Sequence, residues 1–417
     1  MNKEIKQRIE QLNNGKIPKG YKKTDFGVFP SDWVTDKKLI DIGTFGKGKG
    51  IPGNKMQSGG VPCVGYGDIY MKYSHFHFEE AQSFVDEETA KDSQLIKKGT
   101  LLFTGTGETA EEIGKCVCYN GDSTIYAGGD IITFVPQDVN PLFLAYQQYQ
   151  NFSLKKKASF GQGHSVVHIQ KESLEKLNVA YPESKNEQSR IVEILMKWDK
   201  AIELYDKQID ALTRYKAVCL RKMFPAKGQN VPEWRFQGFT GAWEQRKLGD
   251  EAIEILAGGD IDKSKAVENG KYPIYANALT NDGVVGYYDD YYRVKAPAVT
   301  VTGRGEVGFA QARMVDFTPV VRLLAIRSNH DCYFLENAIN NHKVVVESTG
   351  VPQLTVPQLS SYNIFFPKSV EEETRIGEYL HNIDSLITLH QRKKETIINQ
   401  RKALQRYLLN GIVRVKS

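Results

Sequence analysis

Hydrophobic residues recur at alternating steps of four and three along two long segments of the chain, residues 184–224 and 369–411. This spacing keeps apolar side chains on one stripe of an α-helix and is typical of a coiled-coil seam. We therefore predict two long spacer helices over these ranges. The expected seam residues are Ile191, Leu195, Trp198, Ile202, Ile209 and Leu212 in the first helix, and Ile376, Leu380, Ile383, Ile387, Ile397 and Leu404 in the second.

The two predicted helices belong to an internal repeat. Residues 161–224 align with residues 346–409 without a gap, at a constant shift of 185 positions. Asp199 falls on Asp384, and the apolar stripe keeps the same register in both copies. A shared register favours two helices that pack against each other about a pseudo-two-fold axis. The alternative is two unrelated amphipathic helices, each packed on its own domain.

Charge indicates the direction in which the two helices pair. The first half of each is net acidic and the second half is net basic, so an antiparallel pair sets unlike charges together. Each exposed pair is worth only ~0.2–1 kcal/mol, but all of them favour the same arrangement. Helices of about 38 residues would form a rod of about 57 Å. Four polar residues on the stripe either fix the register or extend to solvent at its edge: Lys216, His390, Lys394 and Arg401.

The segments that precede the two helices correspond to each other, but with insertions. The stretch SDWVTDKKL (31–39) matches GAWEQRKLG (241–249), and LLFTGTGE (101–108) matches VTVTGRGE (299–306). We expect each segment to fold as a mixed α/β domain. The predicted order is an N-terminal helix and linker (1–28), a first domain (29–183), the first spacer helix (184–224), a Pro- and Gly-rich linker (225–238), a second domain (239–368), the second spacer helix (369–411) and a tail (412–417).

Composition narrows the class of protein without naming a function. The 417 residues are 41% hydrophobic and 25% charged, with a net charge of +5 that tilts toward a polyanionic partner. No apolar run approaches ~18 residues, so we expect no membrane span, and the first residues lack the apolar centre of a signal peptide. The five cysteines include no C-x-x-C pair, which favours reduced thiols in the cytoplasm.

Motifs for catalysis are weak throughout the chain. NPLF (140–143) resembles the Asn-Pro-Pro-aromatic motif of adenine methyltransferases, but its counterpart in the second half reads DCYF (331–334). The glycines of 48–53 have the spacing of a dinucleotide loop, but Pro52 opposes a helix start there. PESK (182–185) lacks the upstream partner of a metal-dependent nuclease. We therefore expect no catalytic residues and no metal site in this chain.

From about residue 17 to the end, the sequence resembles the specificity subunits of type I restriction-modification enzymes. FPSDW (29–33) and VPEWRFQGFTGAWEQRKLG (231–249) are similar to the openings of target recognition domains. The runs over 161–191 and 348–376 are similar to those that lead into the spacer helices. The second copy departs from the pattern, because Glu-Glu-Thr replaces Glu-Gln-x at 372–374 and Gly-Gln-Gly is absent.

The resemblance implies an α+β fold with two target recognition domains separated by an antiparallel two-helix coiled coil. Each domain would read one half of a bipartite, asymmetric site on double-stranded DNA. The helices would dock two methyltransferase (modification) subunits, and restriction (nuclease-translocase) subunits would complete the complex. The chain itself would bind no cofactor, with S-adenosylmethionine on the methyltransferase partner. The alternatives are a coiled-coil scaffold that binds protein, and a reader fused to an uncharacterised DNA-modifying activity.

Candidate DNA contacts are polar, basic and aromatic residues on loops, because these side chains reach phosphates and base edges. In the first domain they come from a basic Gly-rich loop (43–55), an aromatic segment (65–78) that alternatively forms a half-buried β-hairpin, a strand–turn–strand tip (103–108) and the segment before the first helix. They are Lys47, Lys49, Asn54, Lys55, Tyr66, Tyr70, Thr104, Thr106, Gln162 and His164.

The second domain supplies a corresponding set from its first loop, from YANALTNDG (275–283), from a tyrosine-rich stretch (286–295) and from the turn VTGRGEVG (301–308). They are Lys263, Lys265, Asn277, Asn281, Arg293, Arg304 and Arg313. Tyrosines at this density are as consistent with the cover of a sheet as with stacking on DNA. Arg304 at the tip of its turn is therefore the preferred candidate.

Overall fold

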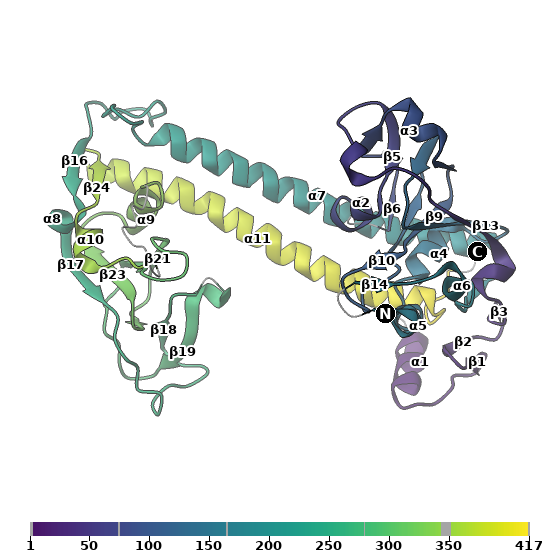
Figure 1. The fold of residues 1–417 in the computed structure, drawn as a ribbon. Helices are drawn as coiled ribbons and strands as arrows, with labels where there is room; N and C mark the ends of the chain where they lie inside the picture. Colours follow the sequence, from purple (N-terminus) through teal and green to yellow (C-terminus); the bar gives the residue numbers. More distant parts are fainter. Residues whose placement is uncertain (1–2, 74–75, 164–165, 279, 343–351, 416–417) are drawn as a thin grey trace. The chain divides into compact units, whose positions relative to one another are not determined.

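The computed structural model describes residues 3–73, 76–163, 166–278, 280–342 and 352–415. The chain forms two compact units. The first unit comprises Met1–Leu204 and Lys394–Ser417, so both chain termini belong to it, and the second comprises Tyr205–Lys393 (Figure 1). The predicted spacer helices are α7 (Lys185–Met223) and α11 (Val370–Leu409), and each contributes residues to both units.

The first unit is built on two mixed sheets. A five-stranded sheet has the order β4-β13-β9-β11-β6 and is antiparallel except for the pair β11–β6. A four-stranded sheet has the order β7-β5-β12-β8, with β5 and β12 parallel. The strands are β4 (Gly43–Lys47), β5 (Val61–Val64), β6 (His77–Phe78), β7 (Ser83–Val85), β8 (Gln94–Ile96), β9 (Thr100–Thr104), β11 (Cys116–Tyr119), β12 (Ile125–Ala127) and β13 (Ile131–Pro136).

Short helices and two-stranded ribbons complete the first unit. The ribbons pair β1 (Tyr21–Thr24) with β2 (Gly27–Pro30), β3 (Trp33–Val34) with β15 (Tyr181–Pro182), and β10 (Thr106–Gly107) with β14 (Val167–His168). The helices are α1 (Lys3–Asn13), α2 (Tyr66–Met71), α3 (Glu87–Lys91), α4 (Pro141–Gln147), α5 (Asn151–Phe160) and α6 (Lys171–Leu174), with 3-10 turns η1 (Leu39–Ile42) and η2 (Gly53–Lys55).

The five-stranded sheet is buried on both faces, which explains the uninterrupted apolar run of β9. Leu101 and Phe103 belong to one hydrophobic cluster, whereas Leu102 between them belongs to another. On β11, Cys116 and Val117 divide in the same way. Successive side chains of a strand point to opposite faces, so a strand with cores on both sides has no polar alternation.

The second unit repeats this topology in a smaller form. Its four-stranded sheet β17-β23-β20-β21 has the order and directions of β4-β13-β9-β11, and β18 pairs β22 parallel and β19 antiparallel. A further ribbon pairs β16 with β24. The elements are β16 (Glu244–Lys247), β17 (Ala252–Ala257), β18 (Tyr272–Tyr275), β19 (Val284–Tyr288), β20 (Ala298–Thr302), β21 (Ala310–Arg313), β22 (Thr318–Pro319), β23 (Leu323–Ser328), β24 (Asn363–Phe366), α8 (Leu248–Glu251), α9 (Cys332–Asn340), α10 (Val356–Ser360) and η3 (Thr280–Gly283).

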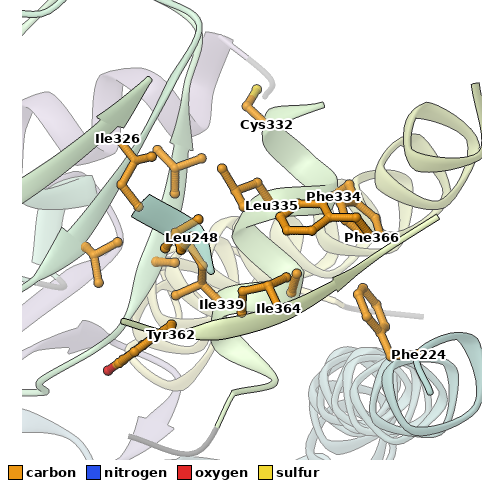
Figure 2. Packing of buried hydrophobic residues seen from close by; sticks show 14 of the residues in the cluster. Phe224, Leu248, Ile326, Cys332, Phe334, Leu335, Ile339, Tyr362, Ile364 and Phe366 are labelled. Carbon is orange, nitrogen blue, oxygen red and sulfur yellow. The ribbon is translucent and has the colours of Figure 1, made fainter. Parts of the chain in front are cut away.

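One large core joins the sheet of the second unit to its helices. Figure 2 shows Phe334 of α9 and Phe366 of β24 in this cluster, with Ile326 of β23. Phe224, which follows the last residue of α7, stacks on Phe334 with ring centroids 5.4 Å apart. Trp243 packs edge-on against Phe334 at 5.7 Å. The segment after α7 is therefore fixed to the core of the second domain.

Within each unit, the start of one long helix packs against the end of the other. In the first unit Ile191 and Leu195 share a cluster with Leu408. In the second, Cys219 of α7 shares a cluster with Ile376 and the next seam residues of α11. Other predicted seam residues are half-buried: Trp198, Ile202, Ile209, Leu212, Ile387, Ile397 and Leu404.

One local prediction is wrong. The alternative hairpin over 65–78 is instead a helix, α2, and the Asp68 carboxylate accepts a hydrogen bond from Gly65 N at 2.8 Å across its first turn. The strand–turn–strand predicted over 103–108 is present, since β9 ends at Thr104 and β10 begins at Thr106, although β9 pairs with β11 and β13 while β10 pairs with β14. The equivalent prediction in the second domain is confirmed, since β20 and β21 form a hairpin.

Candidate functional site

The basic glycine-rich loop of the first domain presents three lysines to solvent. Lys47 ends β4, Lys49 follows it, and Lys55 lies in η2 beside Asn54; all four residues are exposed. Gly48 fixes the course of this loop, because a Cβ there would lie 1.7 Å from Gly128 O. The loop is therefore held against the β12–β13 connection while its cations remain free to meet an anion.

The predicted contacts Tyr70, Thr104 and Thr106 come together, but partly in the interior. Thr104 is fully buried at the end of β9, so its prediction as an exposed tip is wrong. The Tyr70 and Thr104 hydroxyls are 2.9 Å apart, and the Tyr70 hydroxyl also donates to Thr106 O at 3.2 Å. Burial raises the pKa of Tyr70. The hydrogen bonds of Tyr70 therefore anchor the turn at residues 104–106. Tyr66, by contrast, is 43% exposed.

The segment before the first helix closes onto the same turn. Gln162 is exposed and forms an isolated bridge with His168, while the predicted contact His164 lies outside the described residues. His168 Nδ1 lies 3.2 Å from the Thr106 hydroxyl. His168 was not among the predicted contacts, since its position beside β10 depends on the long-range ribbon with β14.

Predicted residues of the second domain divide between exposed and structural positions. Lys263, Lys265 and Arg293 are exposed, and Arg304 is exposed in the turn after β20. Asn281 is exposed with φ 50°, and its amide donates to Val284 O at 3.1 Å.

Arg313 is not available as a DNA contact in this structure. It is 5% exposed, and its guanidinium forms an ion pair with Asp282 at 2.8 Å. The guanidinium also lies 3.7 Å from the centre of the Tyr275 ring. Arg313 therefore holds the turn that contains Asp282, which is the correction to its predicted role.

Polar contacts between the long helices occur at equivalent positions of the repeat. Arg401 Nε donates to Asp199 at 2.8 Å, and Lys216 Nζ donates to Asp384 at 2.7 Å. The first pair is buried, with both side chains 6% exposed, and the second is half-exposed. Because Arg401 and Lys216 bond specific aspartates, their contacts support the register-fixing alternative for these two residues. His390 packs edge-on against Tyr205, with ring centroids 5.6 Å apart.

Glu373 stands where the first copy of the repeat has Gln188, and both side chains accept a hydrogen bond from the backbone at the start of a helix. Gln188 Oε1 accepts a hydrogen bond from Asn140 N at 2.7 Å, and Glu373, its equivalent, accepts one from Asp331 N at 3.2 Å. Glu373 also lies 2.9 Å from His330. The substituted carboxylate thus keeps the original contact and adds one to histidine.

The NPLF motif has a structural use in this chain. Asn140 caps α4, where its side chain accepts from Leu142 N at 3.0 Å and Phe143 N at 3.2 Å. Asp331 caps α9 in the same way. Phe143 is fully buried, so it does not present the aromatic face that a methyltransferase motif would offer to a base.

The described part of the chain has few features that indicate other chemistry. No group of three His, Cys, Asp or Glu residues there could hold a metal ion. None of the helices described is long and apolar enough to cross a membrane. All five cysteines are buried free thiols, and burial raises the pKa of Cys116 to about 12. These thiols are therefore protonated at neutral pH.

Comparison with known proteins agrees with the repeated architecture. Residues 30–214 and 241–399 match the family described as Type I restriction modification DNA specificity domain. The putative type I restriction enzyme MjaX specificity subunit of Methanocaldococcus jannaschii is 24% identical over 432 residues, covering 95% of this chain and 97% of the relative. The putative type I specificity subunit S.MpnORF507P of Mycoplasma pneumoniae is 31% identical over 140 residues, 32% of this chain and 38% of the relative.

Solved structures share the fold. The S subunit of a type I restriction-modification system from M. genitalium superposes with a TM-score of 0.63 at 13% identity, covering 90% of this chain and 96% of that one. A chain from a structure of a type I R-M system superposes with a TM-score of 0.51 at 14% identity, covering 95% and 100%. The family match covers both halves of the repeat, and the chain therefore belongs to the type I restriction-modification DNA specificity family.

Proposed function

We propose that this chain reads a bipartite, asymmetric DNA site, with one domain for each half, and docks the methyltransferase and restriction subunits of its complex. The observation that carries the proposal is the repetition of one sheet topology, followed along the chain each time by a copy of the same long helix. Similar sheets carry different loops. Divergent loops on equivalent sheets are what two readers of different half-sites require.

The proposal includes an antiparallel coiled coil of α7 and α11 about a pseudo-two-fold axis. The equivalent ion pairs Asp199–Arg401 and Asp384–Lys216 support it, because a two-fold axis that exchanges the helices carries one pair onto the other. Two modules reading the same face of B-DNA sit about one helical turn apart, ~34–36 Å. A rod of about 57 Å with domains folded back on it can supply that spacing.

Repeated helices also offer two equivalent docking surfaces, one for each methyltransferase subunit. Leu204 and Leu389 occupy the same position of the repeat, and they are 55% and 45% exposed. Their shared position in the repeat is the reason we place two identical contacts there, one on each helix. S-adenosylmethionine would bind the methyltransferase partner. The buried free thiols suit the reducing cytoplasm in which we place the complex.

The proposal is tested by mapping methylated bases. Host DNA is sequenced for modified positions after the full-length chain is co-expressed with the methyltransferase subunit of its system. The expected result is one motif of two short, different half-sites separated by a gap of fixed length. A chain with Arg304→Ala should change base preference in only one half-site. A contiguous motif, or methylation independent of this chain, would contradict the proposal and favour a protein-binding scaffold.

A further inference from the structure

Two turns of the second unit bring Arg304 and Arg322 to one hollow. Arg304 lies in the turn between β20 and β21, and Arg322 lies in the turn between β22 and β23. Both line a hollow of about 700 Å³, together with Asn277, Gly305, Val321 and Pro352. This meeting is not predictable from the sequence, because Arg322 lies in the largely apolar run VVRLLAI.

Asn277 fastens the two turns to each other. Its Oδ1 accepts a hydrogen bond from Gly303 N at 2.9 Å, and its Nδ2 donates to Val321 O at 3.1 Å. The turns are in direct contact, since a Cβ on Gly303 would lie 2.2 Å from Arg322 O. Asn277 therefore positions the two turns that carry the arginines, and its role in base reading stays a prediction.

Arg322 occupies a backbone conformation that favours glycine. Its φ is 72°, in the left-handed region, where a side chain strains the backbone. The sequence nevertheless places a long cationic side chain there. No ion pair of Arg304 or Arg322 occurs among the residues that the structure describes, and no acidic side chain there lines the hollow. Like charges in one hollow repel, and a phosphate bound by Arg322 offsets that repulsion.

We propose that Arg322 is a DNA-phosphate contact of the second domain, beside the base-reading Arg304 in this hollow. The inference rests on the proposed function, because it names how that domain holds duplex DNA. A guanidinium matches the geometry of phosphate oxygens and stays charged at every physiological pH. The turn that carries Arg322 is fastened at Val321, so the side chain holds the DNA backbone while exposed loops meet the bases.

The test compares Arg322→Gln with Arg327→Gln. Arg327 is five residues further along, 33% exposed, and lies 3.8 Å from Glu254 outside the hollow, so its variant makes the same change in charge. Binding of the full-length chain to random-sequence duplex DNA is measured over a salt series, alone and with the methyltransferase subunit. Arg322→Gln should reduce the salt slope by about one and weaken binding about fivefold near 0.15 M salt. Arg327→Gln should bind as the unmodified chain does.

A second variant separates binding from folding. Arg322→Gly removes the guanidinium and relieves the strained φ, so it should unfold at the same temperature as the unmodified chain or a higher one. It should nevertheless bind DNA as weakly as Arg322→Gln, while Arg322→Lys keeps the salt slope. If both variants that remove the charge bind like Arg327→Gln, the inference is wrong. If the unmodified chain shows no salt-dependent binding, the proposed function itself fails.

Discussion

Single residues in this chain take their roles from partners that are distant in sequence. Tyr70 and Thr104 are 34 positions apart, and Asp282 and Arg313 are 31 apart. Each pair contains a residue that looks like a DNA contact when the sequence is considered alone. The hydrogen-bonding capacity that suits such a residue to DNA also suits it to an internal bond. The carboxylate of Glu336 on α9 likewise takes its properties from partners that are distant in sequence.

Burial raises the pKa of Glu336 to about 7. Its Oε2 accepts from Ala312 N at 3.0 Å, and the charged groups that act on it are Lys216, Asp384 and Arg313. Lys216 and Arg313 favour the ionised form, but they do not overcome burial. The folded protein therefore binds a proton on Glu336 at pH values where an exposed glutamate has released it.

We predict that the Glu336→Gln variant flattens the pH dependence of stability. Between about pH 4.5 and 7 the folded chain holds a proton that the unfolded chain has lost, so the free energy of unfolding falls as the pH rises through this window. The decrease at pH 7 is at most about 3 kcal/mol. Urea unfolding of both proteins at pH 5 and pH 7 measures it. Equal slopes with pH for the two proteins would contradict the assignment.

The long helices α7 and α11 contact each other through two equivalent ion pairs that differ in burial. The pair Asp199–Arg401 is buried, and Asp199 also accepts from the Tyr146 hydroxyl at 2.6 Å. The equivalent pair Asp384–Lys216 is half-exposed. Desolvation makes a buried charge costly when its partner is lost, whereas solvent compensates an exposed one.

Loss of one cation should therefore have unequal effects at the two positions. Arg401→Met leaves the Asp199 carboxylate buried without a counterion and should lower the free energy of unfolding by about 3–5 kcal/mol. Lys216→Met, the matched variant, should lower it by about 1 kcal/mol or less. Chemical unfolding of the full-length chain compares them. The double variant Asp199→Leu with Arg401→Met should recover much of the loss, and a loss as large as in Arg401→Met alone would contradict this account.

The whole molecule consists of one topology used twice. β4-β13-β9-β11 and β17-β23-β20-β21 share order and direction although the loops between them differ. Trp33 packs edge-on against Phe143 in the first unit as Trp243 packs against Phe334 in the second. Because the long helix occurs twice, any docking surface on it also occurs twice. The number of bound methyltransferase subunits should therefore be two.

We expect Leu204→Asp and Leu389→Asp each to remove one methyltransferase subunit from the complex, and the double variant to remove both. An aspartate in the centre of an apolar contact leaves a buried charge without a partner. Native mass spectrometry of the co-expressed complex counts the subunits. Leu95→Asp, at an exposed position of β8, serves as the control and should keep two. Two subunits bound to either single helix variant would remove the case for these docking surfaces.

The sequence by itself determined the elements that are marked by a long, regular pattern of apolar residues. The helices α7 and α11 begin and end within two residues of their predicted ranges, because a repeated apolar stripe needs no knowledge of distant partners. The internal repeat and the mixed α/β class followed from the same sequence. The exposure of the loop lysines and of Arg304 was also predictable from the sequence, because charged, glycine-rich loops favour solvent.

Only the tertiary structure decided which polar residues remain available. It buried Thr104 and Arg313, turned Asn277 into a fastening between two turns, and brought Arg322 beside Arg304. Such outcomes depend on which strands become neighbours, and a sheet of this order joins segments separated by tens of residues. A polar side chain is chemically suited to both an internal bond and a ligand, so the packing around it makes the choice.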